Sequence, residues 1–162
     1  MADMRAKIHD QQNALERLRS CVPGFRTYYD REARREADRA LRGHAVDRLE
    51  EVVRDVQQVI KRLPLGEIRA YQELVKVTEW LANEIRHSDQ GYSGFFGELK
   101  WDSEEALDGL YAQDEEIAAA VADLAARVAA AEFEPSGVES ELRALQRRFA
   151  DRKNRILGLS RS

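Results

Sequence analysis

The residues that could perform chemistry are few and scattered along this sequence. Glu84 and His87 form one Glu-x-x-His pair, which di-iron helix bundles use in duplicate together with two further glutamates. Neither of the other two histidines, His9 and His44, has a glutamate three residues before it. The second pair is therefore missing, and the sequence predicts no metal and no cofactor.

Nucleophilic catalysis has equally little support. His87, Ser88 and Asp89 are adjacent, but a catalytic triad needs residues that meet in space from separate positions. Cys21 is the single cysteine and has no evident activating neighbour, which also excludes an internal disulfide framework and a cysteine-rich zinc site. The sequence contains no Walker-type phosphate loop. We therefore predict no catalytic residues and a protein that is not an enzyme.

One carboxylate, Asp114, interrupts an otherwise apolar 3-4 repeat in the second half of the chain. A carboxylate on a buried seam needs a cationic partner, because an unpaired buried charge is costly. We expect that partner to be an arginine such as Arg34 or Arg35, and the pair to fix the register of the helices. An enzyme with a polar site between helices around Asp114 is an alternative.

An arginine stripe, Arg31, Arg35 and Arg39, repeats at intervals of four residues and so lies on one face of a helix. Such a face can be simply solvated or paired with nearby acids. It can also bind a partner, a phosphate group or an acidic lipid head group. We expect it to take part in docking a protein partner.

Seven of the twelve aromatic residues lie in two short stretches, residues 25–29 and the glycine-rich segment 88–101, which we expect to be a loop. Two interpretations stay open: a plug that seals one end of the bundle against Phe25–Tyr29, or an exposed docking loop. The docking interpretation makes the loop's aromatic residues candidates for binding a partner, namely Tyr92, Phe95, Phe96 and Trp101.

Helical periodicity accounts for most of the chain. Apolar residues recur at steps of three and four, and Pro-Gly-rich breaks separate the periodic segments. The expected helices are residues 4–20, 25–63, 67–87, 102–133 and 138–157. The fold class is therefore all-α: an elongated antiparallel bundle of four to five helices with a coiled-coil-like long hairpin. We expect one domain over 1–162, with residues 1–21 as a weakly attached N-terminal helix.

The expected C-terminal helix combines an apolar stripe with many arginines and lysines. A basic amphipathic helix can lie on an anionic membrane surface, which gives an alternative function as a peripheral membrane or stress-response protein. The same helix can instead close the bundle through its apolar stripe, with its cations near the C-terminal end of the helix dipole.

Composition narrows the class of protein further. The 162 residues are 43% hydrophobic and 35% charged, which argues against disorder. The formal net charge of −4 disfavours a nucleic-acid partner, leaving a protein partner, self-association or an anionic membrane surface. No stretch resembles a secretory signal or a membrane span, so we expect a cytoplasmic protein.

Three short motifs resemble those of an uncharacterised family of bacterial all-helical proteins. They are Pro23-Gly24-Phe25-Arg26 with the arginine-rich run 31–39, Gly91-Tyr92-Ser93-Gly94-Phe95-Phe96, and Leu107–Asp114. The resemblance covers the chain from about Val22 onward and implies no known activity. A loose association of this family with band-7 (stomatin-like) membrane scaffold proteins implies an adaptor role.

Overall fold

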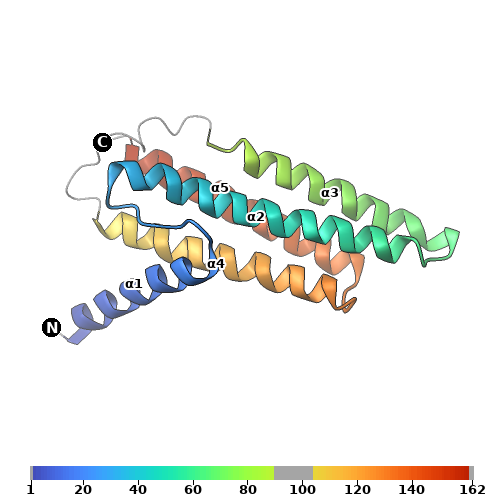
Figure 1. The fold of residues 1–162 in the computed structure, drawn as a ribbon, viewed down its shortest axis with the longest axis horizontal. Helices are drawn as coiled ribbons and strands as arrows, with labels where there is room; N and C mark the ends of the chain where they lie inside the picture. The colour runs from blue at the N-terminus through green and yellow to red at the C-terminus, as the bar shows by residue number, and fades with distance from the viewer. Residues whose placement is uncertain (1, 90–103, 161–162) are drawn as a thin grey trace.

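The computed structural model describes residues 2–89 and 104–160. The fold is all-α, as predicted, and no strand occurs in these two ranges (Figure 1). A single 3-10 turn, η1 (Leu65–Glu67), follows the proline break after α2. The α-helices are α1 (Ala2–Cys21), α2 (Arg31–Ile60), α3 (Ile68–Arg86), α4 (Glu104–Ala129) and α5 (Pro135–Ser160).

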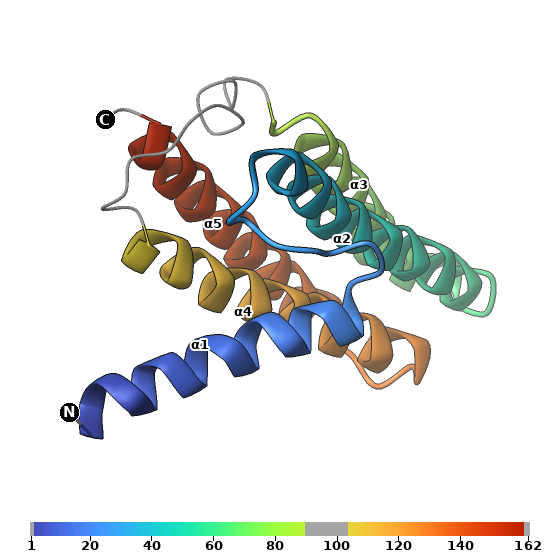
Figure 2. The ribbon, with the colours of Figure 1, turned by 60° about the vertical axis from the view of Figure 1, so that its left-hand side comes forward.

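Four of the helices, α2 to α5, form the bundle. Helices α2 and α4 run in one direction and α3 and α5 return, so that α2–α3 and α4–α5 are antiparallel hairpins (Figure 1). Both α2 and α5 pack against α3 and α4. Helix α1 packs against α4 and crosses it at an angle (Figure 2).

This packing places α3 and α4 at opposite corners of the bundle. A tight turn can join only helices that are neighbours, so the connection from α3 to α4 has to be long. Its length therefore has a topological reason.

The long helix begins later than its periodicity indicates, at residue 31 instead of 25. Asp30 caps α2, since its carboxylate accepts a hydrogen bond of 2.9 Å from the backbone N–H of Glu32. The preceding residues form an irregular connection in which Gly24 takes a φ of 82°, a left-handed conformation that suits glycine. The predicted start was wrong because this connection, residues 22–30, is anchored on α4.

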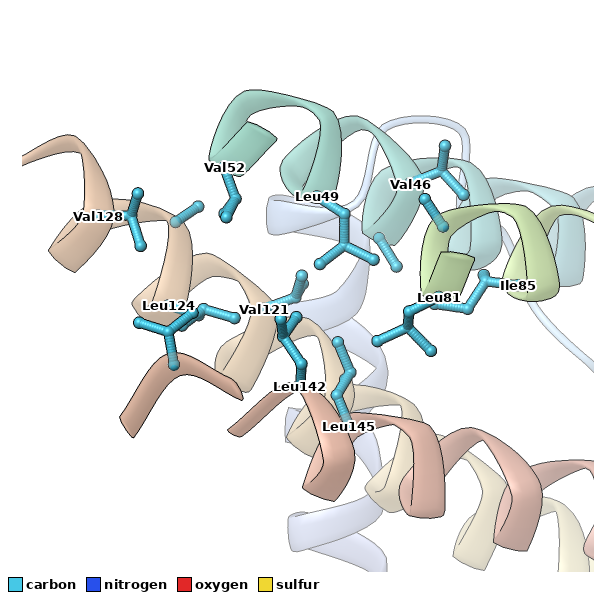
Figure 3. Packing of buried hydrophobic residues seen from close by; sticks show 14 of the residues in the cluster. Val46, Leu49, Val52, Leu81, Ile85, Val121, Leu124, Val128, Leu142 and Leu145 are labelled. Carbon is cyan, nitrogen blue, oxygen red and sulfur yellow. The ribbon is translucent and has the colours of Figure 1, made fainter. Parts of the chain in front are cut away.

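Two apolar clusters make up the core. The first lies between α2, α3, α4 and α5 and includes Val46, Leu49, Val52, Leu81, Ile85, Val121, Leu124, Val128, Leu142 and Leu145 (Figure 3). The second joins α1 and the 22–30 connection to the early turns of α2 and α4. Ala14 and Leu18, both in the second half of α1, are buried in this second cluster. They tie α1 to the bundle.

Candidate functional site

A cluster of four fully buried polar side chains crosses the bundle. It consists of Tyr28, Asp38, Asp114 and Arg152, each with 0% exposure. Tyr28 comes from the 22–30 connection, and the other three come from α2, α4 and α5 respectively. We call this set the buried cluster.

The guanidinium group of Arg152 organises the buried cluster. Its Nε donates to Asp114 Oδ1 at 2.7 Å, and its Nη1 donates to Asp38 Oδ1 at 2.8 Å. Its Nη2 donates to the Tyr28 hydroxyl at 2.9 Å, and that hydroxyl in turn donates to Asp114 Oδ2. One planar cation therefore joins three separate segments with directional, charge-assisted bonds.

The buried cluster lies where the two apolar clusters meet. Along α5, Phe149 belongs to the first apolar cluster and Ile156 to the second, with Arg152 between them. Along α2, Leu41 belongs to the second apolar cluster and Ala45 to the first, and Asp38 lies about one turn before this boundary. The buried cluster is thus a charged layer inserted between two hydrophobic layers.

Arg42 connects the buried cluster to the end of α3. Its Nε lies 3.0 Å from Asp38 Oδ2, and its Nη2 lies 3.4 Å from Asp89 Oδ2. Its Nη1 donates to the backbone carbonyl of Arg86 at 2.9 Å. Because carbonyls at a helix C-terminus lack partners within the helix, this arginine caps α3 while it neutralises Asp38.

Burial and charge shift the pKa values within the buried cluster. Burial raises the pKa of the Asp114 carboxyl group above its ordinary value, and burial likewise raises the pKa of Tyr28 well above 10. Burial alone would lower the pKa of Arg152, but Asp114 and the other neighbours raise it well above its ordinary value. Two carboxylates face two guanidinium groups, Arg42 and Arg152, so the formal charges balance.

The geometry disfavours catalysis at Asp114. Neither Asp114 nor Arg152 exposes any side-chain surface from which a substrate could be reached. Both oxygens of Asp114 accept hydrogen bonds from groups within the buried cluster. A general base needs a substrate proton within hydrogen-bond reach, and this arrangement offers no such approach.

The predicted ion pair at Asp114 exists, but its predicted partner was wrong. The partner is Arg152 of α5, not Arg34 or Arg35 of α2. Arg34 instead donates to the backbone carbonyl of Tyr28 at 2.7 Å and to that of Tyr29 at 3.4 Å, and so holds the connection before α2. The exposed Arg35 lies on the outer surface of α2.

A sequence signal for Arg152 was present. The buried positions of α5 follow a 3-4-3-4 repeat, and Arg152 takes one of these positions. It interrupts its stripe just as Asp114 interrupts the stripe of α4. Two opposite charges that each interrupt an apolar stripe are natural partners. The repeat in α5 is Leu142, Leu145, Phe149, Arg152 and Ile156.

Tyr111 anchors the 22–30 connection on α4. Its hydroxyl accepts a 2.6 Å hydrogen bond from the backbone N–H of Tyr28 and is 2.8 Å from the Thr27 hydroxyl. The ring of Phe25 lies edge-on to Tyr28, with 5.4 Å between centroids. These aromatic residues pack into the bundle.

The aromatic candidates of the glycine-rich segment lie outside the described residues; they are Tyr92, Phe95, Phe96 and Trp101.

The arginine stripe is exposed. Arg31, Arg35 and Arg39 line a shallow hollow of about 530 Å³ on the surface of α2 together with Glu32 and Glu36. Arg39 makes no hydrogen bond or ion pair within the described ranges. Arg39 therefore presents its cationic group to the solvent, and acidic residues are interleaved along the stripe.

Most of the basic groups on α5 contact the protein itself. Arg143 pairs with Glu139 at 2.9 Å, and Arg148 pairs with Glu116 at 3.1 Å. The apolar stripe of α5 is buried in the core. A helix that binds a membrane surface needs that apolar face for lipid, so this arrangement disfavours the membrane alternative. Among the described residues, no helix has the length and apolar character needed to cross a bilayer.

Metal chemistry gains no support from the described part of the chain. Residues 2–89 and 104–160 hold no group of three or more metal-ligating side chains. Glu84 and His87, the incomplete di-iron motif, are both exposed near the end of α3.

Cys21 is a free thiol at the end of α1, and the residue is exposed. The part of the thiol that is buried raises its pKa, which lowers its reactivity at neutral pH.

The raised pKa of Tyr28 predicts a pH dependence of stability. Between pH 10 and the higher native pKa, the native state holds a proton that the unfolded state releases, so stability falls as pH rises. In a pH titration over the range in which the protein stays helical, tyrosinate formation raises the absorbance at 295 nm. This increase should be the same for Tyr28→Phe as for the wild type. Tyr29→Phe is the matched control, since Tyr29 is 50% exposed. A reduced signal from Tyr28→Phe with helicity retained would contradict the burial argument.

Comparisons with protein-family models, with curated proteins and with solved structures gave no match to this chain.

Proposed function

We propose that this chain is a non-enzymatic interaction module that docks a protein partner through the arginine stripe. The glycine-rich segment, residues 88–101, is the second part of the proposed docking surface. The observation that supports this most is a contrast in accessibility. The polar groups best placed for chemistry are sealed in the buried cluster, whereas the arginine stripe is open to solvent.

The chemistry of the stripe favours a partner segment that carries carboxylates. Guanidinium groups bind carboxylates with two parallel hydrogen bonds, and arginine is enriched in protein interfaces. The arginines recur once per helical turn, which suits acidic residues repeated along a partner helix.

The test compares the wild type with a stripe variant, Arg31→Ser/Arg35→Ser/Arg39→Ser, in quantitative affinity capture from native lysate. The matched control, Arg54→Ser/Lys61→Ser/Arg69→Ser, removes the same charge from exposed positions at the far end of the bundle. Circular dichroism first establishes that all three proteins are equally helical. A second variant, Phe95→Ser/Phe96→Ser, tests the contribution of the glycine-rich segment.

We expect the wild type and the control to capture a protein that the stripe variant loses. Its capture should weaken as salt rises, because exposed charges are screened within about 10 Å at 0.1 M ionic strength. Identical capture by the stripe variant and the control would contradict the proposal.

A further inference from the structure

The turn from α2 to α3 and the turn from α4 to α5 lie at the same end of the bundle, away from the start of α2 (Figure 1). The second turn packs against α3, since the ring of Phe133 lies edge-on to that of Tyr71, with 6.0 Å between their centroids. Tyr71 belongs to the first helical turn of α3, so the chain before it projects beyond Phe133. We call residues 61–69 the projecting tip and residues 130–134 the recessed tip.

The two tips carry opposite charges. The projecting tip has three exposed cations and one exposed acid; they are Lys61, Arg62, Arg69 and Glu67. The recessed tip has two exposed carboxylates, Glu132 and Glu134, and no cation. Within the described ranges none of these six side chains forms an ion pair or a hydrogen bond. The excess positive charge of one tip therefore matches the negative charge of the other, but the two are not paired within the chain.

Each tip also presents an apolar side chain. Leu65 is 91% exposed in the short 3-10 turn of the projecting tip. Phe133 of the recessed tip is only partly buried against the first apolar cluster. A lone exposed leucine is ordinary, but Leu65 projects among cations that have no partner. The tip thus combines apolar surface to bury with charge to complement, which are the two ingredients of a protein interface.

We propose that this end of the bundle docks against the same end of a second copy of the chain, related by a two-fold axis. The axis is perpendicular to the long direction of the bundle and passes midway between the two tips. Rotation about it exchanges the tips, so the projecting tip of each copy meets the recessed tip of the other. One axis serves the charges, the shapes and the apolar groups together, because all of them lie on the same two tips.

The choice of a second copy rests on this self-complementarity. Basic and projecting features meet acidic and recessed ones at both contacts, and the two-fold relation uses each contact twice. Exposed ion pairs are individually weak, so the dimer should be reversible and sensitive to salt. The arginine stripe lies at the opposite end of α2, so the dimer leaves it accessible and does not depend on the proposed docking function.

Sedimentation equilibrium of the full chain tests the proposal over protein concentrations from about 1 μM to about 0.5 mM. The wild type should dimerise within this range, and its dissociation constant should increase as the salt concentration rises. Leu65→Ala should raise the constant by at least about 10-fold, because each dimer buries two copies of this side chain. Trp80→Ala is the matched control. It removes an apolar side chain that is 55% exposed in the second half of α3, and it should leave the constant unchanged.

Two charge-reversed variants test which surfaces meet. Lys61→Glu/Arg62→Glu makes both tips of a chain acidic, and Glu132→Lys/Glu134→Lys makes both tips basic. Each variant alone should dimerise more weakly than the wild type, because like charges meet at both contacts. An equimolar mixture should form a heterodimer, because each of its two contacts pairs an acidic tip with a basic one.

A further control separates the tips from the overall charge of the chain. Arg35→Glu/Arg39→Glu changes the net charge by the same amount as Lys61→Glu/Arg62→Glu, but at the opposite end of α2. It should dimerise as the wild type does. Circular dichroism first establishes that all variants are equally helical.

Four outcomes would overturn the proposal. A wild type that remains monomeric at every concentration shows that a second copy does not dock here. A dimer that Leu65→Ala leaves unchanged shows that the copies meet elsewhere. A mixture of the charge-reversed variants that associates no better than either variant alone shows that the opposite tips do not meet. Equal weakening by Arg35→Glu/Arg39→Glu shows that only the overall charge matters.

Discussion

Replacing Arg152 with alanine is expected to lower the free energy of unfolding by about 3–5 kcal/mol. The guanidinium group is fully buried and bonds Asp114, Asp38 and the Tyr28 hydroxyl. Its removal leaves Asp114 as a buried carboxylate without a cation, whereas Asp38 keeps Arg42. Losing one partner of a buried ion pair costs far more than the pair itself contributes, because the remaining charge stays out of water.

Urea denaturation followed by circular dichroism at 222 nm measures this effect. The matched control is Arg148→Ala, one turn earlier on the same helix, which removes an exposed ion pair with Glu116 and should cost at most about 1 kcal/mol. The Arg152→Ala variant should stay cooperative, so that the shift in midpoint reports stability directly. If the two variants lose equal stability, the buried cluster does not contribute in the way its geometry indicates.

The positions at which the helices begin and end could be predicted from the sequence, because they depend on local signals. Apolar residues at steps of three and four, together with the Pro-Gly breaks, located each helix to within a few residues at most ends. The start of α2 was the exception. Residues 25–30 have no strong breaker of their own, and they are held out of the helix by Arg34 and Tyr111, which contact them from α2 and α4.

The buried cluster was only half predictable. The position of Asp114 in an apolar repeat shows that this carboxylate needs a cation, which is a local inference. Which helix supplies the cation depends on the packing order of the helices, which the periodicity of α4 alone does not indicate. Both α2 and α5 pack against α4, so arginines from either helix were candidates. The position of Arg152 in its own apolar stripe distinguishes it from Arg34 and Arg35.

Replacing the whole buried cluster with apolar residues is expected to have the opposite effect. In the variant Tyr28→Phe/Asp38→Leu/Asp114→Leu/Arg152→Met, no member leaves a partner unsatisfied. Leucine keeps the branching of aspartate at Cγ, and methionine keeps the length of the arginine stem. Well-packed apolar replacements of buried ion pairs are commonly neutral or stabilising by about 1–4 kcal/mol, so this variant should be at least as stable as the wild type.

Arg42 is the one neighbour that the replacement changes, because it loses Asp38. It retains Asp89 and the carbonyl of Arg86, and its side chain is 9% exposed, so it keeps partners at the bundle surface. The comparison of the quadruple variant with Arg152→Ala therefore separates the cost of an unpaired charge from the contribution of the intact cluster. Urea midpoints give the stability difference, and a quadruple variant less stable than the wild type would contradict the argument.

The same variant tests why a charged layer lies between two apolar clusters. Directional bonds from Arg152 to α2 and α4 are satisfied in only one axial register of the helices, whereas apolar side chains tolerate several. If the buried cluster selects that register, the quadruple variant should be stable but should show broadened and multiple amide resonances. A single sharp set of resonances, as dispersed as that of the wild type, would show that apolar packing alone specifies the bundle.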